Sequence, residues 1–586
     1  MPKENAGTKD PMNDFVVKEF DRYENFHRDR FNQAQKDYDN WIGKAPKREH
    51  PWMNAVHVPV TFEGEQTITP RLFTALFPTD APVDVKVEGE AAEQQGIRIK
   101  GIIQHYFRIC DVQGEAHDSM SDASLFGTGY IEGGSWYVKQ GWVHDRESGV
   151  RYKTLIESRP DCKFVSFFEI FPHPAKRRMD DDLPLIRRRF SDAEFLKKLG
   201  NNPEMKIKNL AKALDSTVPM KSGMSTYMNK KRDEYEILEY WGPWDESYTG
   251  SDGTVVKNEA VPHWITVVNR SVVIRAIPNP YDHQMPPFCK LVFVPDRKNS
   301  WFGVGVGQIG RSTQERLNKL VNQRLDNVDL VLNKQGCYNG SDTFLNTKKL
   351  QVSKPGLWHK VQDVTTTLKW METPDVTASA YQEEALAKQD FRESTGATAQ
   401  LMPGNKSEQH RTALGIQILQ GAAGERFRPI LRRLEVDLIQ KLAMFFFSNL
   451  KQFMTEPEWV LITGKNGRVE PIEITPEQIQ AKVLFVPTGI SETVNKEAQI
   501  NNLMRYKEIT QQDPTINRQE INKRIGELFG FKDVEKLLTP MQAPAQGTGM
   551  SPEQQYLIQQ RLNEGASPDQ IKQEMLGTPP PIKPGG

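Results

Sequence analysis

The residues best placed to do chemistry are the glycines of a short run, Trp301-Phe-Gly-Val-Gly-Val-Gly-Gln-Ile-Gly310, directly before a long helical pattern. Within the run, Gly305-Val-Gly307-Gln-Ile-Gly310 fits the G-x-G-x-x-G spacing, in which glycines let backbone amides approach a pyrophosphate. This spacing raises the alternative of a nucleotide-binding enzyme. The competing interpretation is a tight backbone passage into a structural helix.

The surrounding pattern opposes a nucleotide site. A dinucleotide loop follows its strand directly and opens a short crossover helix. Here a polar stretch separates the nearest strand candidate, Leu291-Val-Phe-Val294, from the first glycine, and the helical pattern continues from about 308 to 333. The acidic residues that should bind ribose, Asp326 and Asp329, fall inside that helix. The pattern therefore favours a structural passage in which small residues permit close approach. Its glycines are Gly303, Gly305, Gly307 and Gly310.

No other motif predicts catalysis or metal binding. The sequence has no H-E-x-x-H, G-x-S-x-G or Walker A motif. His173 beside Asp180-Asp-Asp182 comes closest to a metal cluster, but an acidic triplet in a turn is more typical of a solvated surface. Cys162 and His173 lack a third group that would orient a nucleophile and its base. We therefore expect no enzyme activity, no cofactor and no metal.

Composition narrows the class of protein. A chain of 586 residues exceeds one compact core, and 37% hydrophobic with 26% charged residues is typical of an ordered soluble protein. The 76 basic residues balance 76 acidic ones, which argues against tight nucleic-acid binding through a wholly basic surface. Four scattered cysteines without a signal peptide indicate free thiols in a reducing cytoplasm. The most apolar run, 442–450, is too short to span a membrane.

The elements before the glycine run predict an α+β domain that ends near residue 300. Apolar spacing over 14–41 indicates a helix with one buried stripe, and another helix candidate covers 90–107. Strands are expected at Tyr235–Trp241 and at Trp264–Ile277, where the chain folds back at Asn269-Arg270.

The elements behind the glycine run are mainly helical. After the helix over 308–333 come short strands and turns, a second helix over 376–393, a polar loop, and a very long helix from 410 to 453. This last helix should bend between 421 and 429, because small residues and proline interrupt it. The residues responsible are Gly421, Gly424 and Pro429.

The order of these parts, with its local signatures, resembles the portal (head-to-tail connector) proteins of tailed bacteriophages, especially those of short-tailed phages. The likeness covers about residues 15–535. The signatures that carry it are Gly127-Thr-Gly129 before a strand with Trp136, Pro280-Tyr-Asp-His-Gln-Met-Pro-Pro287, Phe302-Gly303 before Arg316-Leu-Asn-Lys-Leu-Val-Asn-Gln-Arg-Leu-Asp326, and His410-Arg-Thr-Ala-Leu-Gly415.

The resemblance implies a portal-type fold assembled as a ring, and a division of the chain into parts. These would be an α+β wing (1–300), stem helix 1 (301–333), a small mixed clip (334–375), stem helix 2 (376–393), a tunnel loop (394–409), a long kinked helix (410–453), a helical crown (454–540) and a flexible C-terminal tail (541–586).

The resemblance also implies a function without catalytic residues. The chain would form a dodecameric ring at one capsid vertex, through which double-stranded viral DNA is packaged and ejected. Its partners would be copies of itself, the terminase large subunit, head–tail adaptor and tail proteins, and the major capsid and scaffolding proteins, with no membrane. The protein would be made in the host cytoplasm and end in the virion.

The polar loop and its borders carry four basic candidates for contact with passing DNA, Arg392, Lys406, His410 and Arg411. They could touch phosphates transiently, or they could be intersubunit or solvent-facing charges. Zero net charge suits a conduit, because strong attraction to phosphates would slow sliding DNA. Another phage head–tail structural or adaptor protein remains an alternative, as does the nucleotide-binding enzyme.

Overall fold

The structure is a computed structural model whose described residues fall in two compact units, Met1–Val494 and Asn495–Gly586. The described residues are 10–87, 92–144, 149–200, 206–216, 234–249, 255–298, 300–341, 343, 345–346, 348, 360–365, 367–374, 377–397, 426–463, 469–479, 483–487, 503–509, 518–528 and 560. In the second unit, the helix α13 spans Arg518–Leu528.

Four helices begin the first unit, and each starts or ends where the local chemistry requires. They are α1 (Pro11–Trp41), α2 (Val60–Leu76), α3 (Ala92–Ile109) and α4 (Val112–Phe126). The carboxylate of Asp10 caps α1 by accepting the amide of Met12, and Pro11 supplies a first residue that needs no donor. Gly127 ends α4 in the left-handed region at φ 88°. The helix expected over 14–41 is therefore confirmed, whereas α2 was not anticipated.

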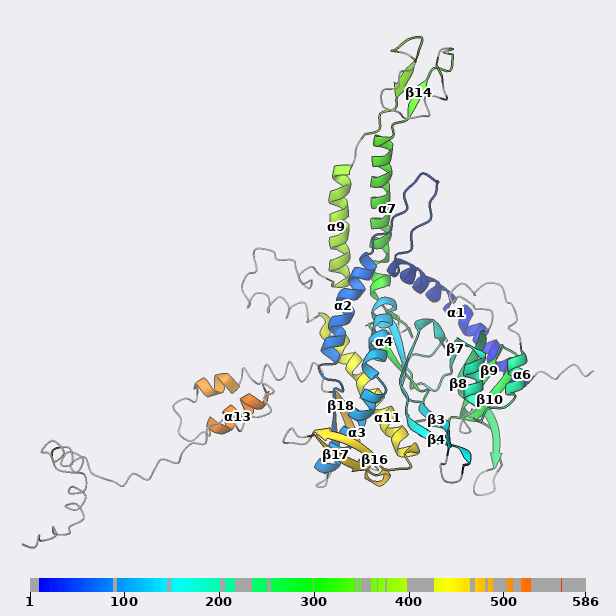
Figure 1. Cartoon of the computed structure of the whole chain (residues 1–586), viewed down its shortest axis with the longest axis vertical. Coiled ribbons are helices and arrows are strands. Elements are labelled where there is room, and N and C mark those ends of the chain that lie inside the picture. The colour runs from blue at the N-terminus through cyan, green and yellow to red at the C-terminus, as the bar shows by residue number, and fades with distance from the viewer. Residues whose placement is uncertain are drawn as a thin grey trace, which may run out of the picture. The chain divides into compact units, whose positions relative to one another are not determined.

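Three groups of antiparallel strands pack with these helices (Figure 1). The order in the five-stranded sheet is β10-β9-β8-β7-β6, in the three-stranded sheet it is β11-β2-β5, and β3 with β4 forms a separate ribbon. Their bounds are β2 (Thr128–Glu132), β3 (Trp136–His144), β4 (Arg151–Pro160), β5 (Lys163–Val165), β6 (Ile170–Pro172), β7 (Leu185–Ser191), β8 (Tyr235–Thr249), β9 (Val255–Val268), β10 (Val272–Pro278) and β11 (Phe288–Val292).

The turn between β9 and β10 was predicted correctly. Asn269 and Arg270 both have positive φ, at 49° and 56°, as a two-residue hairpin turn requires. The helix α5 (Ala193–Gly200) is capped by Asp192, whose carboxylate accepts a hydrogen bond from the amide of Phe195. The helix α6 (Leu210–Asp215) packs beside it.

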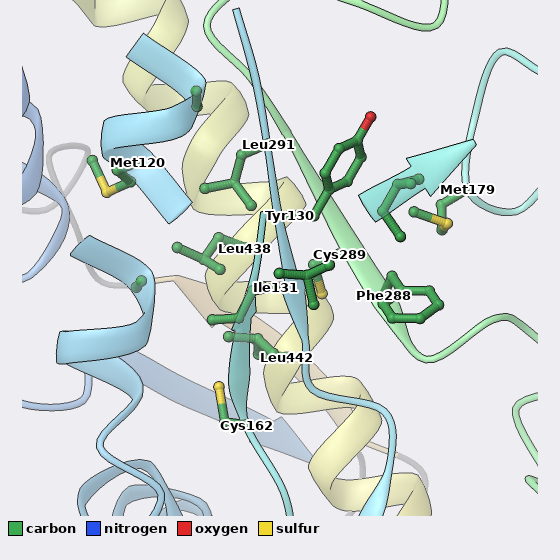
Figure 2. Close-up of a cluster of buried hydrophobic side chains, with 14 of the residues drawn as sticks. Met120, Tyr130, Ile131, Cys162, Met179, Phe288, Cys289, Leu291, Leu438 and Leu442 are labelled. Carbon is green, nitrogen blue, oxygen red and sulfur yellow. The ribbon is translucent and has the colours of Figure 1, made fainter. Parts of the chain in front are cut away.

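Part of the core of the first unit lies between α4, β2, β11 and the helical segment of residues 435–453. Figure 2 shows side chains from these elements meeting. Those labelled there include Met120, Ile131, Leu291, Leu438 and Leu442, and all are buried. Three cysteines, Cys110, Cys162 and Cys289, are buried free thiols, whereas Cys337 is exposed.

Two helices leave this body and carry a small sheet at their far end (Figure 1). The helix α7 spans Val306–Leu332, which at 27 residues is roughly 40 Å long. The helix α9 (Thr377–Thr395) returns antiparallel to it, and β14 (Gly336–Tyr338) pairs with β15 (Leu368–Trp370) between them. Both helices were predicted, and their bounds differ from the expected ones by one or two residues.

The long helix predicted to end at 453 is partly described. Residues 426–434 are α-helical, η4 (Glu435–Gln440) is a π-helical turn, and α11 (Lys441–Phe453) completes it. Pro429 lies in the first of these segments, while Gly421 and Gly424 lie outside the described residues. The described irregularity is thus the π-helical turn, which the sequence did not predict.

The chain behind the long helix forms strands in its described part. The strands β16 (Glu458–Thr463) and β17 (Val469–Ile474) pair in an antiparallel hairpin. A third strand, β18 (Val483–Pro487), pairs with β1 (Val83–Val87), and η5 (Pro476–Ile479) lies between. None of the described helices is long and apolar enough to cross a bilayer.

Candidate DNA-channel segment and the glycine passage

The glycine passage begins after a short antiparallel pair of strands. β12 (Val294–Pro295) pairs with β13 (Gly303–Val304), and α7 starts directly behind β13. A strand therefore does precede the glycines, contrary to the sequence analysis. It is antiparallel and two residues long, however, so it does not belong to the parallel βαβ unit that holds a dinucleotide.

Each glycine of the passage faces protein at close range. A Cβ on Gly303 would lie 2.3 Å from the carbonyl oxygen of Gly127, and one on Gly305 would lie 2.3 Å from that of Leu125. At Gly310, a Cβ would lie 2.1 Å from the ring of Phe391 on α9. Cβ atoms do not approach other atoms this closely, so only glycine fits. These distances explain the run as packing.

The anion position beside the first turn of α7 is taken by a side chain of the protein. A Cβ on Gly307 would lie 2.8 Å from the carboxyl carbon of Asp37. Arg311 binds both oxygens of that carboxylate, with N–O distances of 2.8 and 2.7 Å. A carboxylate is favourable near a helix N-terminus, where the peptide dipoles point their positive ends. This partner of Arg311 lies on α1, far from it in the sequence.

The residues before the glycines anchor the start of α7 by packing, as expected. Trp301 is buried, and its Nε1 donates to the hydroxyl of Tyr130 at 2.6 Å. Phe302 is also buried and meets the ring of Phe31 edge-on. The guanidinium of Arg30 donates to the carbonyl of Gly303 at 3.0 Å. The passage is thus fixed to α1 and β2.

Two sets of ion pairs join α7 to α9, an exposed one around Arg316 and a largely buried one around Arg324. The guanidinium of Arg316 donates to Glu383 at 2.6 Å and to Asp390 at 3.4 Å. Arg324 pairs with Glu384, which also accepts from Lys388 at 2.7 Å. These opposite charges neutralise one another along the pair of helices.

On the side of α7 away from α9, a row of three amide side chains and one carboxylate binds the segment between α1 and α2. We call this segment the strap (residues 42–59) and the row of side chains the amide row. The side-chain oxygen of Asn322 accepts a hydrogen bond from the backbone amide of Val56 at 2.7 Å, and its side-chain nitrogen donates to the carbonyl of Val56 at 2.9 Å. In the same way, Asn318 accepts a hydrogen bond from the backbone amide of Val58 at 2.9 Å, and the carboxylate of Asp326 accepts one from the backbone amide of Asn54 at 2.7 Å.

The spacing of this row matches an extended chain. Four residues of helix rise about 6.0 Å and two residues of strand about 6.6 Å, so each turn of α7 meets every second residue of the strap. The spacing of four residues between Gln314, Asn318, Asn322 and Asp326 is visible in the sequence and was missed.

Of the four basic candidates near the polar loop, the structure describes Arg392. Its Nη2 donates to Glu63 on α2 at 2.6 Å, and its Nε donates to the same oxygen at 3.2 Å. The guanidinium is therefore engaged within the chain, a partner that sequence spacing could not indicate. Lys406, His410 and Arg411 lie outside the described residues.

The acidic triplet near His173 forms an ordered turn. Asp181 accepts the amides of Arg177 and Arg178 at 2.8 and 2.7 Å, and the Nζ of Lys176 donates to the carbonyl of Leu183 at 2.7 Å. Burial lowers the pKa of Lys176 to about 8, although the three nearby aspartates oppose the change. Among the described residues, no group of three or more His, Cys, Asp or Glu side chains could hold a metal ion.

Comparison with known families decides the identity of the chain. A family model described as "Phage SU10 portal protein" matches residues 112–567. The chain belongs to this family of tailed-phage portal proteins. No individually curated protein matches it.

The portal family accounts for the organisation described above. The match begins at the first residue of α4 and includes the glycine passage, both helices α7 and α9, and the long helix. A portal is the head-to-tail connector of a phage, and its family is structural rather than enzymatic. A role in DNA packaging follows from the family. Nothing supports the alternatives of a nucleotide-binding enzyme or of another head–tail component.

Proposed function

We propose that this portal protein assembles as a ring of identical copies, twelve by resemblance to other portals, around a channel for double-stranded viral DNA. In this proposal the α+β body up to 300 is the wing, and α7 and α9 form the stem. Residues 334–375 form the clip, 394–409 the tunnel loop, 454–540 the crown and 541–586 the tail. The ring would occupy one capsid vertex of the virion, and the likeness to short-tailed phages stays a prediction.

The observation that carries this proposal is the pair formed by α7 and α9. The pair leaves a body with a large apolar core, joins that core through Leu317, Ala387 and Phe391, and carries exposed ion pairs such as Arg316–Glu383 on its surface. In the described residues, its far end carries the paired strands β14 and β15. A two-stranded sheet is marginal in water on its own, so neighbouring copies would complete it.

The charges along the stem support passage of DNA. Arg316 and Arg324 are neutralised by acidic residues of α9, so the helices do not form a basic surface. A strongly basic wall would hold phosphates and slow the movement of DNA. Transient contacts are then left to Lys406, His410 and Arg411. Arg392 fixes the start of the tunnel loop through Glu63.

Exposed apolar side chains at the far end of the stem support docking of other proteins there. Tyr338, Trp370 and Met371 are all more than half exposed around β14 and β15. Aromatic residues in such positions are typical of binding surfaces. We expect terminase and, later, adaptor or tail proteins to bind here, with capsid and scaffolding proteins on the body.

The ring is tested by native mass spectrometry of the purified full-length protein. Twelve copies of a 67.0 kDa chain give about 800 kDa. A monomer under every condition would contradict the proposal, and a different multiple would correct the number of subunits.

The DNA contacts are tested by reversing charge in the tunnel loop. Lys406→Glu with Arg411→Glu should leave rings intact but reduce packaged DNA and phage titre, because the loop would repel phosphates. Lys198→Glu on α5 is the matched control, since that lysine lies exposed on the body. Unchanged packaged DNA and titre would remove Lys406 and Arg411 from the channel.

A further inference from the structure

The two flanks of the stem differ. At about 100° per residue, the row from Gln314 to Asp326 that holds the strap covers one side of α7, and the residues that bind α9, such as Arg316 and Arg324, lie roughly opposite. Figure 1 shows α9 on one side of α7 and the strap on the other. One flank of the stem is therefore extended chain and the other is a helix.

The strap presents apolar side chains to solvent although its backbone is held firmly. Trp52 is 54% exposed and Val56 is 44% exposed. The amide and the carbonyl of Val56 are both bonded to the side chain of Asn322, so the residue cannot turn inward. Side chains displayed from a fixed backbone lose little entropy on binding. Tryptophan in particular dominates many protein interfaces.

The outer face of α9 is the helix surface turned away from α7. Its residues share exposure and helical spacing, and they are Ala378, Gln382, Leu386 and Gln389. Leu386 is 48% exposed. The uncharged side chains on this face would let an aromatic ring lie against the helix.

Ring symmetry would bring these two flanks together. In a cyclic ring each interface is heterologous, so one flank of a subunit meets the opposite flank of the next. Both flanks are exposed in one copy of the chain, Trp52 and Val56 on the strap and Leu386 on α9. A second copy of this chain therefore fits the exposed strap.

We propose that the strap of one subunit packs against the outer face of α9 of the next subunit, with Trp52 and Val56 as its anchors. The inference rests on the proposed ring. The amide row of α7 then has a role in assembly, because it fixes the strap in the shape that the neighbour binds.

A disulfide between subunits tests this contact in the full-length protein. Val56→Cys and Gln382→Cys are combined in a Cys337→Ser background, which removes the exposed native thiol. Burial raises the pKa of Cys110 and of Cys289 to about 12, so these thiols stay unreactive. Mild oxidation of rings should give a ladder of covalent dimers, trimers and higher species on a non-reducing gel. Each single cysteine should give monomers.

A substitution of the anchor gives an independent result. Trp52→Ser should raise the protein concentration needed for half-assembly by about tenfold or more. Trp459→Ser is the matched control, because Trp459 is similarly exposed on β16, and it should assemble like the unsubstituted chain. If the unsubstituted chain forms no ring, the proposed function fails. If rings form but give no disulfide ladder, and Trp52→Ser assembles normally, the strap–α9 contact is wrong.

Discussion

The body and the stem of this portal protein use charged residues in opposite ways. In the body, Arg187 is 8% exposed and bonds to Glu132 at 2.7 Å and to Glu169 at 2.9 Å. In the stem, Arg316 pairs with Glu383 at 2.6 Å, but the two side chains are 45% and 51% exposed. A buried arginine needs a carboxylate partner, because an unpaired charge in the protein interior destabilises the fold. Exposed ion pairs contribute little to the free energy of unfolding.

This difference teaches how the two regions gain stability. In its described part, the body buries an extensive apolar core, and buried arginines such as Arg187 bind carboxylates of the same chain. The stem shares that core through Leu317 and Phe391, and polar contacts at the surface hold its strap and its exposed face. A stem of this kind gains its remaining stability from neighbours, which agrees with assembly into a ring.

The largest effect is expected where backbone meets backbone at the base of the stem. Gly305→Val would place a Cβ 2.3 Å from the carbonyl oxygen of Leu125 and 2.4 Å from the amide nitrogen of Gly127. Neither atom can move without shifting α4, so we expect a loss of more than about 3 kcal/mol. Thermal unfolding and soluble yield measure it. Gly340→Ala in the clip is the control, because its Cβ would meet nothing within 4 Å. Equal behaviour of both variants would contradict the packing role of the passage.

The next effect tests the buried pairs of the body. Arg187→Leu should cost about 3 kcal/mol, because two carboxylates lose their buried partner. Burial alone would raise the pKa of Glu132, but Arg187, Arg189 and Lys163 hold it below its usual value. The native pair therefore stabilises the fold above the unfolded pKa of Glu132, and this contribution disappears as pH falls through the lower folded pKa. The difference in the free energy of unfolding between the unsubstituted chain and Arg187→Leu, measured in urea, should therefore become smaller as the pH is lowered. A deficit that does not change with pH would contradict this account.

A partly buried carboxyl of the body should show the opposite dependence on pH. Burial raises the pKa of Asp122 to about 7. The hydrogen bond from the amide of Phe167 lowers this pKa, and the nearby negative charges of Asp118, Glu169 and Glu65 raise it further. Because the folded pKa exceeds the unfolded value, the contribution to stability is complete at low pH and declines as pH rises to about 7. Asp122→Asn should therefore stabilise the protein by about 2 kcal/mol at pH 8 and change little near pH 4.

The control for this prediction is Asp29→Asn, because that side chain is exposed on α1 and is not among the groups that raise the pKa of Asp122. It should leave the pH profile of thermal unfolding unchanged. A lower stability of Asp122→Asn at pH 8 would mean that the carboxylate is needed in its charged form.

A smaller effect is expected for the strap. Asn322→Ala removes both bonds to Val56 and should weaken the attachment of the strap by about 1 kcal/mol. Limited proteolysis within 44–53 should become faster while the melting temperature of the body stays constant. Gln323→Ala, exposed on the same helix, is the control. Equal cleavage rates in both variants would show that the amide row does not hold the strap.

The smallest effect is expected for the exposed ion pairs of the stem. Arg316→Ala should change the free energy of unfolding by less than about 1 kcal/mol, with a difference that vanishes in high salt. A cost comparable to that of Arg187→Leu would erase the distinction between body and stem.

Local patterns predicted much of the fold. The helices α1, α7 and α9 follow from apolar spacing, and the β9–β10 hairpin follows from Asn269-Arg270, because these signals lie in adjacent residues. The glycine passage was also recognised as structural before its contacts were known. The helix α2 was missed because Pro70 lies inside it and its cap, Pro59, makes no side-chain hydrogen bond.

Contacts between distant residues could not be predicted from spacing. β18 pairs with β1 across most of the chain, and Arg392 binds Glu63 on α2. Arg311 on α7 likewise binds Asp37 on α1. For the candidate channel, the sequence therefore identifies the basic residues, but only the fold shows that one of them, Arg392, is already paired with an acidic residue of the same chain.

Electron microscopy of the purified full-length protein tests the central claim most directly. The account predicts rings with an open axial channel, in which the stem formed by α7 and α9 surrounds the axis below a wider body. Monomers under all conditions, or particles whose α7–α9 stems point away from a common axis, would contradict it.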